Sequence, residues 1–173
     1  MLAIKAWVVN PYRIPSSSME PTLHCARPGQ GCQAARSDRV LANRFVYHFS
    51  DPERGDIVVF ETTPEADRIC PGPGGVFVKR LIGLPGDELE VRGEETESTQ
   101  LYVNGVAVSE PYLFGGEVGE PFGPVTVPED QFFMMGDNRW QSCDSREWGP
   151  VPRGNLIGPV FSLYWPPIRI RFL

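Results

Sequence analysis

Short apolar runs separated by turn residues dominate the chain, and this pattern predicts strands rather than long helices. The runs have the length and the β-branched or aromatic bias of strands. No segment calls for a helix longer than two or three turns. We therefore expect a mainly β fold, with antiparallel sheets in a distorted sandwich or barrel. The expected strands cover residues 37–47, 56–61, 76–84, 101–108, 131–135, 156–163 and 168–172.

The segments between these runs are expected to be loops or exposed stretches. Residues 62–75 are rich in Pro and Gly, and residues 109–128 read as a partly irregular loop. Residues 88–100 are acidic and are expected at the surface. Residues 136–146 are so polar and rich in turn residues that we do not expect them in the core.

Two of the strand predictions carry a stronger local signal. Within 101–108, Asn104-Gly105 supplies the two residues that a type I′ hairpin turn places at positive φ. The run 168–172 alternates apolar side chains with arginines, which predicts one buried and one solvent-facing side. The expected buried side holds Ile168, Ile170 and Phe172, and the expected wet side holds Arg169 and Arg171.

Composition and charge narrow the class of protein. The chain has 173 residues, 41% of them hydrophobic, which is enough for one packed core or a core with a small insert. Gly and Pro each occur 18 times, in keeping with short strands and many turns. The net charge of −6 argues against a nucleic-acid partner and against adhesion to anionic lipid by charge alone. Contact with a membrane would have to come from inserted apolar surface.

The four cysteines and two histidines lack the spacing of a metal site. No C-x-x-C or H-x-x-x-H pattern occurs, so we expect neither a zinc site nor any other cofactor. An even number of cysteines in a turn-rich β protein indicates two disulfides in an oxidising compartment. Four unpaired thiols are the alternative.

The first nine residues, MLAIKAWVV, are mostly apolar but too few to span a bilayer. They also lack the features of a complete signal peptide. Two interpretations stay open. The stretch is either the first strand of the core or the outer end of a membrane anchor that is missing or truncated in this chain.

A cluster of three serines, Ser16 to Ser18, raises the question of a nucleophile and its base. Nothing in the sequence indicates that His24 faces the serine cluster, and His48 is expected at the surface. Lys79 lies in the middle of an apolar strand, where burial could lower its pKa by the roughly 2–3 units that a neutral base needs near pH 8. Alternatively, Lys79 and Arg80 simply extend to solvent on opposite faces.

The order of several motifs resembles the bacterial type I signal peptidases, which are membrane-anchored serine proteases with a Ser-Lys dyad. The matching motifs are spread over nearly the whole chain. It rests on IPSSSMEPTL (14–23), DRVL (38–41), RGDIVVF (54–60), VKRLIGLPGD (78–87), MGDNR (135–139), SCDSR (142–146) and WGPVP (148–152).

The resemblance implies a role for several residues. Ser18, directly before Met, matches the nucleophile, and Lys79 matches the general base. Ser16 matches the oxyanion-hole hydroxyl, with the backbone N–H of Ser18 as second donor. Ser142 matches the serine that hydrogen-bonds the lysine, and the supporting ion pair matches Asp144 and Arg146.

The substrates implied by the resemblance are signal peptides of exported preproteins, cut after A-x-A-like sites. An extended substrate would lie between residues 10–15 and the strand of Lys79, with small side chains at the first and third positions before the cut. Ile14, Pro15, Phe77 and Val78 are the expected contacts, and the floor candidates also include Val8 and Leu81. The expected location is the plasma membrane, with the catalytic domain on the extracytoplasmic side.

Further expectations concern organisation. Residues 1–86 and 131–173 would form the catalytic core, and 87–130 a small inserted β subdomain. Cys25 is expected to pair with Cys32 around a short turn, and Cys70 with Cys143 beside the site, although Cys143 could be a free thiol. An apolar rim near Trp7, Trp165 and residues 161–167 would rest on the bilayer surface, with ordinary core packing as the alternative.

Two other functions compete with that of a peptidase. A self-cleaving repressor of the SOS type shares the Ser-Lys chemistry, but it predicts a DNA-binding domain and an Ala-Gly cleavage site that this sequence lacks. A non-catalytic β domain that binds export sequences would not need both Ser18 and Lys79.

Overall fold

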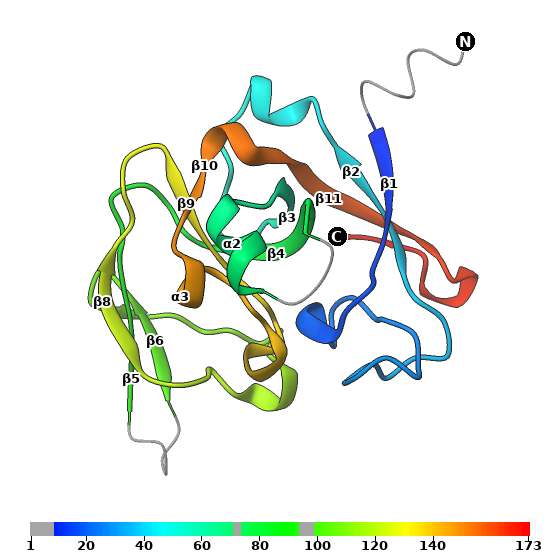
Figure 1. Cartoon of the computed structure of the whole chain (residues 1–173), viewed down its shortest axis with the longest axis horizontal. Coiled ribbons are helices and arrows are strands. Elements are labelled where there is room, and N and C mark those ends of the chain that lie inside the picture. Colours follow the sequence, from blue (N-terminus) through cyan, green and yellow to red (C-terminus); the bar gives the residue numbers. More distant parts are fainter. Residues whose placement is uncertain (1–8, 71–73, 94–98) are drawn as a thin grey trace.

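Two antiparallel sheets form the framework of the protein, as seen in a computed structural model that describes residues 9–70, 74–93 and 99–173 (Figure 1). The mainly β, antiparallel prediction is confirmed. The large sheet has the order β1 (Val9–Arg13), β2 (Arg39–Asn43), β11 (Leu156–Trp165), β3 (Ile57–Glu61), β4 (Val76–Gly83), β9 (Gln131–Met135) and β10 (Val151–Pro152), with β12 (Arg171–Phe172) paired to β11.

The long strand β11 connects the two halves of the large sheet. Its first half pairs with β3 and its second half with β2, and the register shifts within each pairing. Gly158 lies in the first half, where a Cβ atom would come within 1.9 Å of the carbonyl oxygen of Asn43. Only glycine permits this close crossing of two backbones.

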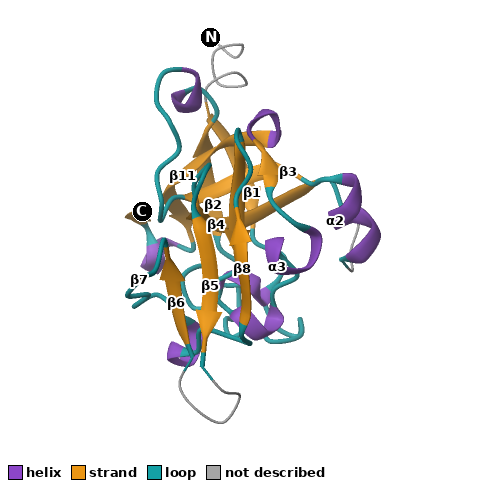
Figure 2. Ribbon diagram, turned by 90° about the vertical axis from the view of Figure 1, so that its left-hand side faces the viewer, coloured by secondary structure: helices purple, strands orange, loops and turns teal. Residues whose placement is uncertain are grey.

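The second sheet has the strand order β7 (Val106–Ala107), β6 (Gln100–Val103), β5 (Glu88–Arg92) and β8 (Phe122–Thr126) (Figure 2). All four strands come from within the predicted insert, residues 87–130. They share a hydrophobic cluster with the large sheet, in which Leu89 and Val91 accompany Phe133 and Met135. The division into a core and a subdomain stays a prediction.

The hairpin prediction is confirmed, because Asn104 and Gly105 have φ of 52° and 76° between β6 and β7. The helices within the described residues are short, as expected. They are α2 (Pro64–Ile69), α3 (Ser145–Trp148) and the 3₁₀ turns η1 (Ser17–Met19), η2 (Val46–His48), η3 (Phe114–Gly116), η4 (Arg139–Gln141), η5 (Arg153–Asn155) and η6 (Pro167–Arg169).

Three of the expected loops contain regular structure. The acidic stretch 88–100 begins with strand β5, whose Leu89 is fully buried between charged neighbours. Strand β8 lies in the expected loop 109–128. Helix α2 lies in the expected loop 62–75, where the Thr63 hydroxyl accepts a hydrogen bond from the Ala66 N–H. In each case a short apolar or capping signal was hidden among polar or breaker residues. The strand expected over 37–47 ends at Asn43.

The prediction that 136–146 stays out of the core is wrong. Asp137 and Asp144 are fully buried, and Arg139 is 3% exposed. Such burial is tolerated because each charge has a partner. Asp137 pairs with Arg80, and Arg139 pairs with Glu110.

The C-terminal run is not the alternating strand that the sequence predicts, because Pro167–Arg169 form η6 and only Arg171–Phe172 form a strand, β12. Arg171 is exposed as expected, but the apolar side chains are not buried. Ile168 and Phe172 are 93% and 84% exposed, whereas Arg169 reaches inward to the fully buried carboxylate of Asp38 at 2.9 Å. The ion pair with a buried carboxylate overrides the apolar alternation. Among the described residues, no helix has the length and apolar character needed to cross a bilayer.

Candidate active site

The nucleophile candidate lies in a tight turn at the end of the first strand. After β1, the Ile14 N–H donates to the Asp38 carbonyl, and the chain then forms η1 with Ser18 6% exposed. The hydroxyls of Ser16 and Ser18 are 3.3 Å apart. The Asn138 N–H donates to the Ser18 carbonyl at 3.0 Å, so the last motif of the chain holds this turn in place.

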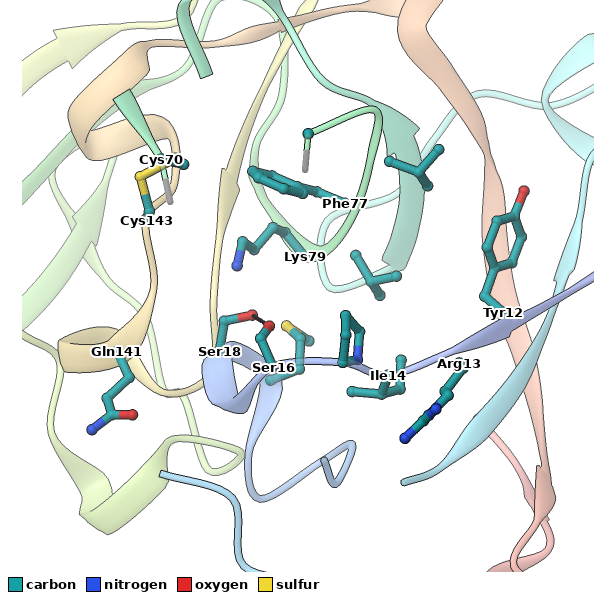
Figure 3. Close-up of a pocket in the computed structure, with 15 residues that line it drawn as sticks. Tyr12, Arg13, Ile14, Ser16, Ser18, Cys70, Phe77, Lys79, Gln141 and Cys143 are labelled. Carbon is teal, nitrogen blue, oxygen red and sulfur yellow. Dashed lines mark hydrogen bonds between the residues drawn. A yellow bond between two sulfur atoms is a disulfide. The ribbon is translucent and has the colours of Figure 1, made fainter. Parts of the chain in front are cut away.

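Lys79, the expected base, has an environment that suits a neutral amine. It lies in the middle of β4, opposite Val58 of β3, and is 5% exposed. Burial lowers its pKa to about 8, while the charge of Asp144 opposes this effect and the charge of Arg146 adds to it. Its amine points toward the hydroxyls of Ser16 and Ser18 (Figure 3).

A hydrogen-bonded loop of residues 142–146 lies near Lys79, whose pKa responds to the charges in it. Ser142 Oγ donates to Asp144 Oδ2 at 2.7 Å, and Arg146 Nε donates to Asp144 Oδ1 at 2.8 Å. Burial acts to raise the pKa of Asp144, but the bonds and charge of Arg146 and the charge of Lys79 hold it below its ordinary value. The resemblance implied a bond from Ser142 to Lys79; in the described part of the chain, Ser142 bonds Asp144 instead.

Both expected disulfide pairs come together. Cys25 joins Cys32 with their Cα atoms 5.0 Å apart, and Cys70 joins Cys143 at 5.8 Å. The second bridge links the segment before β4 to the residue after Ser142 (Figure 3). It therefore ties together two segments that line the same pocket as Lys79.

A pocket of about 380 Å³ opens at the two candidate catalytic side chains. Its lining includes Ser16, Ser18 and Lys79, together with all four expected substrate contacts, Ile14, Pro15, Phe77 and Val78. Most of this lining is apolar. Leu81 does not line the pocket, because it is fully buried in the core cluster around Phe60 and Met134. Val8 and Trp7 lie outside the described residues.

Several residues of the site were missed by sequence reasoning. Arg80 reaches Asp137 with two hydrogen bonds, and Thr22 Oγ1 donates to the same carboxylate. Glu20 is fully buried and pairs with the ring of His24. A carboxylate in the middle of the nucleophile motif was the available signal, because such a residue needs a partner if the motif folds inward.

The histidines do not form a serine–histidine pair here. His24 is engaged with Glu20, and His48 is exposed, as predicted. Within residues 9–70, 74–93 and 99–173, no three His, Cys, Asp or Glu side chains are grouped to hold a metal ion. The chemistry that the arrangement can perform is nucleophilic attack by a serine with a lysine as base.

The chain is also similar to known proteins. A family model described as signal peptidase, peptidase S26, matches residues 1–165. The chain is 40% identical over 172 residues to a probable signal peptidase I-2 of Synechocystis sp., covering 99% of this chain and 70% of the relative. It is 39% identical to a signal peptidase I of Bacillus amyloliquefaciens, covering 97% of this chain and 82% of that relative.

A solved structure is also similar. The crystal structure of a signal peptidase I from Enterococcus faecalis matches with a TM-score of 0.50 and 34% sequence identity, covering 64% of this chain and 97% of that chain. The family match, the relatives and the solved structure all lead to the same assignment. The chain belongs to the signal peptidase family, peptidase S26.

Proposed function

We propose that this chain, as a signal peptidase I, removes signal peptides from exported preproteins with Ser18 as nucleophile and Lys79 as general base. The observation that carries the proposal is the burial of Lys79, with its pKa lowered to about 8, at the pocket that Ser18 also lines. A self-cleaving repressor and a non-catalytic binding domain are not favoured by the relatives.

The reaction follows from the positions of these groups. The neutral amine of Lys79 takes the proton of the Ser18 hydroxyl, and the oxygen attacks the carbonyl before the cut. The lysine, now charged, gives its proton to the departing amine, which leaves an acyl-enzyme on Ser18. Lys79 then takes a proton from water, the hydroxide attacks the ester, and Ser18 recovers its proton.

The developing oxyanion needs donors at the turn itself. We assign this role to Ser16 Oγ and the Ser18 N–H, because the Ser16 hydroxyl lies 3.3 Å from that of Ser18. Removing one such donor typically lowers kcat by 10²- to 10³-fold. Asp144 and Arg146 would act as positioning residues that hold the loop behind the lysine.

Substrate choice is expected to follow the apolar walls of the pocket. Ile14, Phe77 and Val78 leave room for small side chains at the first and third positions before the cut. These positions point the same way in an extended chain. A peptide series tests this: Ala at the first position should be cleaved at least tenfold faster than Leu. Equal rates would show that these residues do not form the specificity pocket.

The proposal places the substrate-binding side at a membrane surface, on the extracytoplasmic side of the plasma membrane. The rim expected near Trp165 is half-buried, and the exposed apolar side chains lie just beyond it, at Ile168, Ile170 and Phe172. Polar substitution at Ile168 and Phe172 should weaken sedimentation with neutral phosphatidylcholine vesicles. Unchanged sedimentation would contradict the membrane contact.

The dyad is tested by preprotein cleavage. Ser18→Ala and Lys79→Ala should each abolish cleavage while the folded state persists in circular dichroism. Lys79→Arg should fail as well, because a guanidinium is not deprotonated in this pH range. His48→Ala, which changes an exposed histidine, is the control and should cleave normally. Robust cleavage by Lys79→Arg would refute the dyad.

A further inference from the structure

A second pocket adjoins the first on the far side of the nucleophile turn. It has a volume of about 400 Å³ and is lined by residues of three segments. The turn contributes Ser17, the loop closed by the Cys25–Cys32 bridge contributes Gln30, and η4 contributes Trp140. We call it the distal pocket. The mechanism described above does not use it.

The two pockets are adjacent. Pro15, Ser16 and Gln141 line both of them. Figure 3 shows Gln141 on the opposite side of Ser18 from Ile14 and Arg13. If the residues before the cut lie against Ile14, the chain after the cut continues past Ser18 toward Gln141.

We propose that the distal pocket binds the beginning of the mature protein, namely the side chain of one of the first two residues after the cut. This inference rests on the proposed function, since it concerns the other half of the same substrate. It makes Gln30 and Trp140 specificity-determining residues for the leaving side of the reaction.

The wall of the distal pocket is held rigidly. The buried carboxylate of Glu20 accepts hydrogen bonds from the N–H groups of Cys25 and Gln33, at 3.1 and 3.3 Å. A Cβ atom on Gly31 would lie 2.0 Å from Gln141 Oε1, so the loop backbone packs directly on that amide. A wall that needs no ordering on binding loses less free energy when a ligand enters.

Ser17 secures the same amide from the side of the nucleophile turn. Its hydroxyl donates to Gln141 Oε1 at 2.8 Å, which fixes the amide between the turn and the loop. Ser17 is buried, whereas Gln30 and Trp140 are exposed and available to a ligand. The pocket therefore has a fixed frame and two accessible side chains.

The chemistry of the lining selects an uncharged occupant. None of its eight lining residues carries an ionised group: they are Pro15, Ser16, Ser17, Gly29, Gln30, Cys32, Trp140 and Gln141. The indole of Trp140, 58% exposed, offers an aromatic face, and the Gln30 amide offers hydrogen bonds. A charged side chain would lose hydration there without gaining a partner. Amide and aromatic side chains fit best.

A third pocket lies on the other side of Trp140 and provides the competing route. It is lined by Glu120, Arg146 and Glu147 among others, and so it is charged. It shares no lining residue with the pocket at Ser18, whereas the distal pocket shares three. The three shared residues therefore favour the distal pocket as the site for the chain after the cut.

The test uses peptides with one signal sequence and different residues after the cut. Gln, Phe, Glu or Lys is placed in turn at the first and at the second position, and kcat/KM is measured. We expect the wild type to favour Gln and Phe over Glu and Lys by about tenfold at one of these positions. The control substrate is an anilide with the same residues before the cut and no amino acid after it. Its cleavage rate depends on the dyad and not on the distal pocket.

Three variants at exposed positions locate the preference. Trp140→Ala should reduce the ratio of kcat/KM for the Phe peptide to that for the Glu or Lys peptide to near one. Gln30→Glu should raise cleavage of the Lys peptide several-fold relative to the Glu peptide. Phe49→Ala, which removes an exposed aromatic ring elsewhere (76% exposed), should keep the wild-type preference.

Each other outcome has a separate meaning. Equal cleavage of all peptides by the wild type would overturn the inference, as would a preference that both Trp140→Ala and Gln30→Glu leave intact. A preference that responds to Glu147→Gln instead would place the substrate in the third pocket and also overturn it. Failure of the wild type on the anilide as well as the peptides would contradict the proposed function itself.

Discussion

Arg80 and Asp137 form a two-point ion pair, with Arg80 Nε and Nη2 donating to the two carboxylate oxygens at 2.8 and 2.6 Å. Both residues are buried, and Thr22 Oγ1 donates to the same carboxylate. Arg80 follows the proposed base Lys79 in the chain, and Thr22 follows the turn of the proposed nucleophile Ser18. One carboxylate thus holds together the segments that carry the two proposed catalytic groups.

The first prediction concerns this carboxylate. Asp137→Asn leaves the guanidinium of Arg80 buried without its partner, which should lower the free energy of unfolding by about 3 kcal/mol. Urea denaturation measures this loss, and kcat/KM should fall with it. The matched control is Glu65→Gln, which breaks the exposed pair with Arg68 and should change stability by less than about 0.5 kcal/mol. Equal effects of the two variants would contradict the structural role of Asp137.

The second prediction concerns pH. In the proposed mechanism Lys79 acts in its neutral form, so activity should rise with pH and level off above its pKa of about 8. The charge of Asp144 raises this pKa and that of Arg146 lowers it. Asp144→Asn should therefore move the midpoint of the acid limb to lower pH, and Arg146→Gln to higher pH. Midpoints that stay fixed, or that move in the same direction, would show that another group sets the limb.

The third prediction is that Lys79 destabilises the fold. Folding lowers the pKa of Lys79 from 10.5 to about 8, which corresponds to a loss of roughly 3 kcal/mol in folding stability. The loss is complete below pH 8, where Lys79 is protonated in both the folded and the unfolded chain. Stability should rise as pH increases from 8 to 10.5, since the unfolded chain then binds more protons. Lys79→Met should be inactive but more stable at pH 7, with a smaller advantage at pH 10.5. A less stable variant at pH 7 would contradict this account.

The fourth prediction concerns His24, whose ring pairs with the fully buried carboxylate of Glu20. His24→Ala should lower the free energy of unfolding by about 1–3 kcal/mol, since a buried acceptor is left without its partner. The acid limb set by Lys79 should keep its midpoint. Denaturation of His24→Ala and His48→Ala side by side is the measurement, and similar stabilities would refute the role of the pair.

Sequence reasoning succeeded where a local pattern determines the structure. The apolar run around Lys79 predicted its strand, and Asn104-Gly105 predicted the hairpin. The motifs predicted that Ser18 and Lys79 lie together, and both line one pocket. Each of these features is encoded within a few neighbouring residues or in the order of known motifs.

The failures share a physical cause, which is pairing between residues far apart in sequence. Asp38 turns Arg169 inward and leaves Ile168 outside, against the alternation of the C-terminal run. Arg80 allows Asp137 to be buried in a segment that looked too polar for the core. The partner of a charged residue cannot be identified from its local sequence, so these burials could not be foreseen.

The Cys70–Cys143 bridge has a consequence for the lifetime of the molecule. It closes a covalent ring, 73 residues in sequence separation, that contains the whole second sheet and its hairpin, where Val106 is 68% exposed. Exposed hairpins are frequent sites of backbone nicking. A nick in this hairpin leaves a two-chain enzyme whose halves stay joined, with Ser18 and Lys79 on one piece and Asp144 on the other. The bridge thus keeps the two pieces from separating after a single cut.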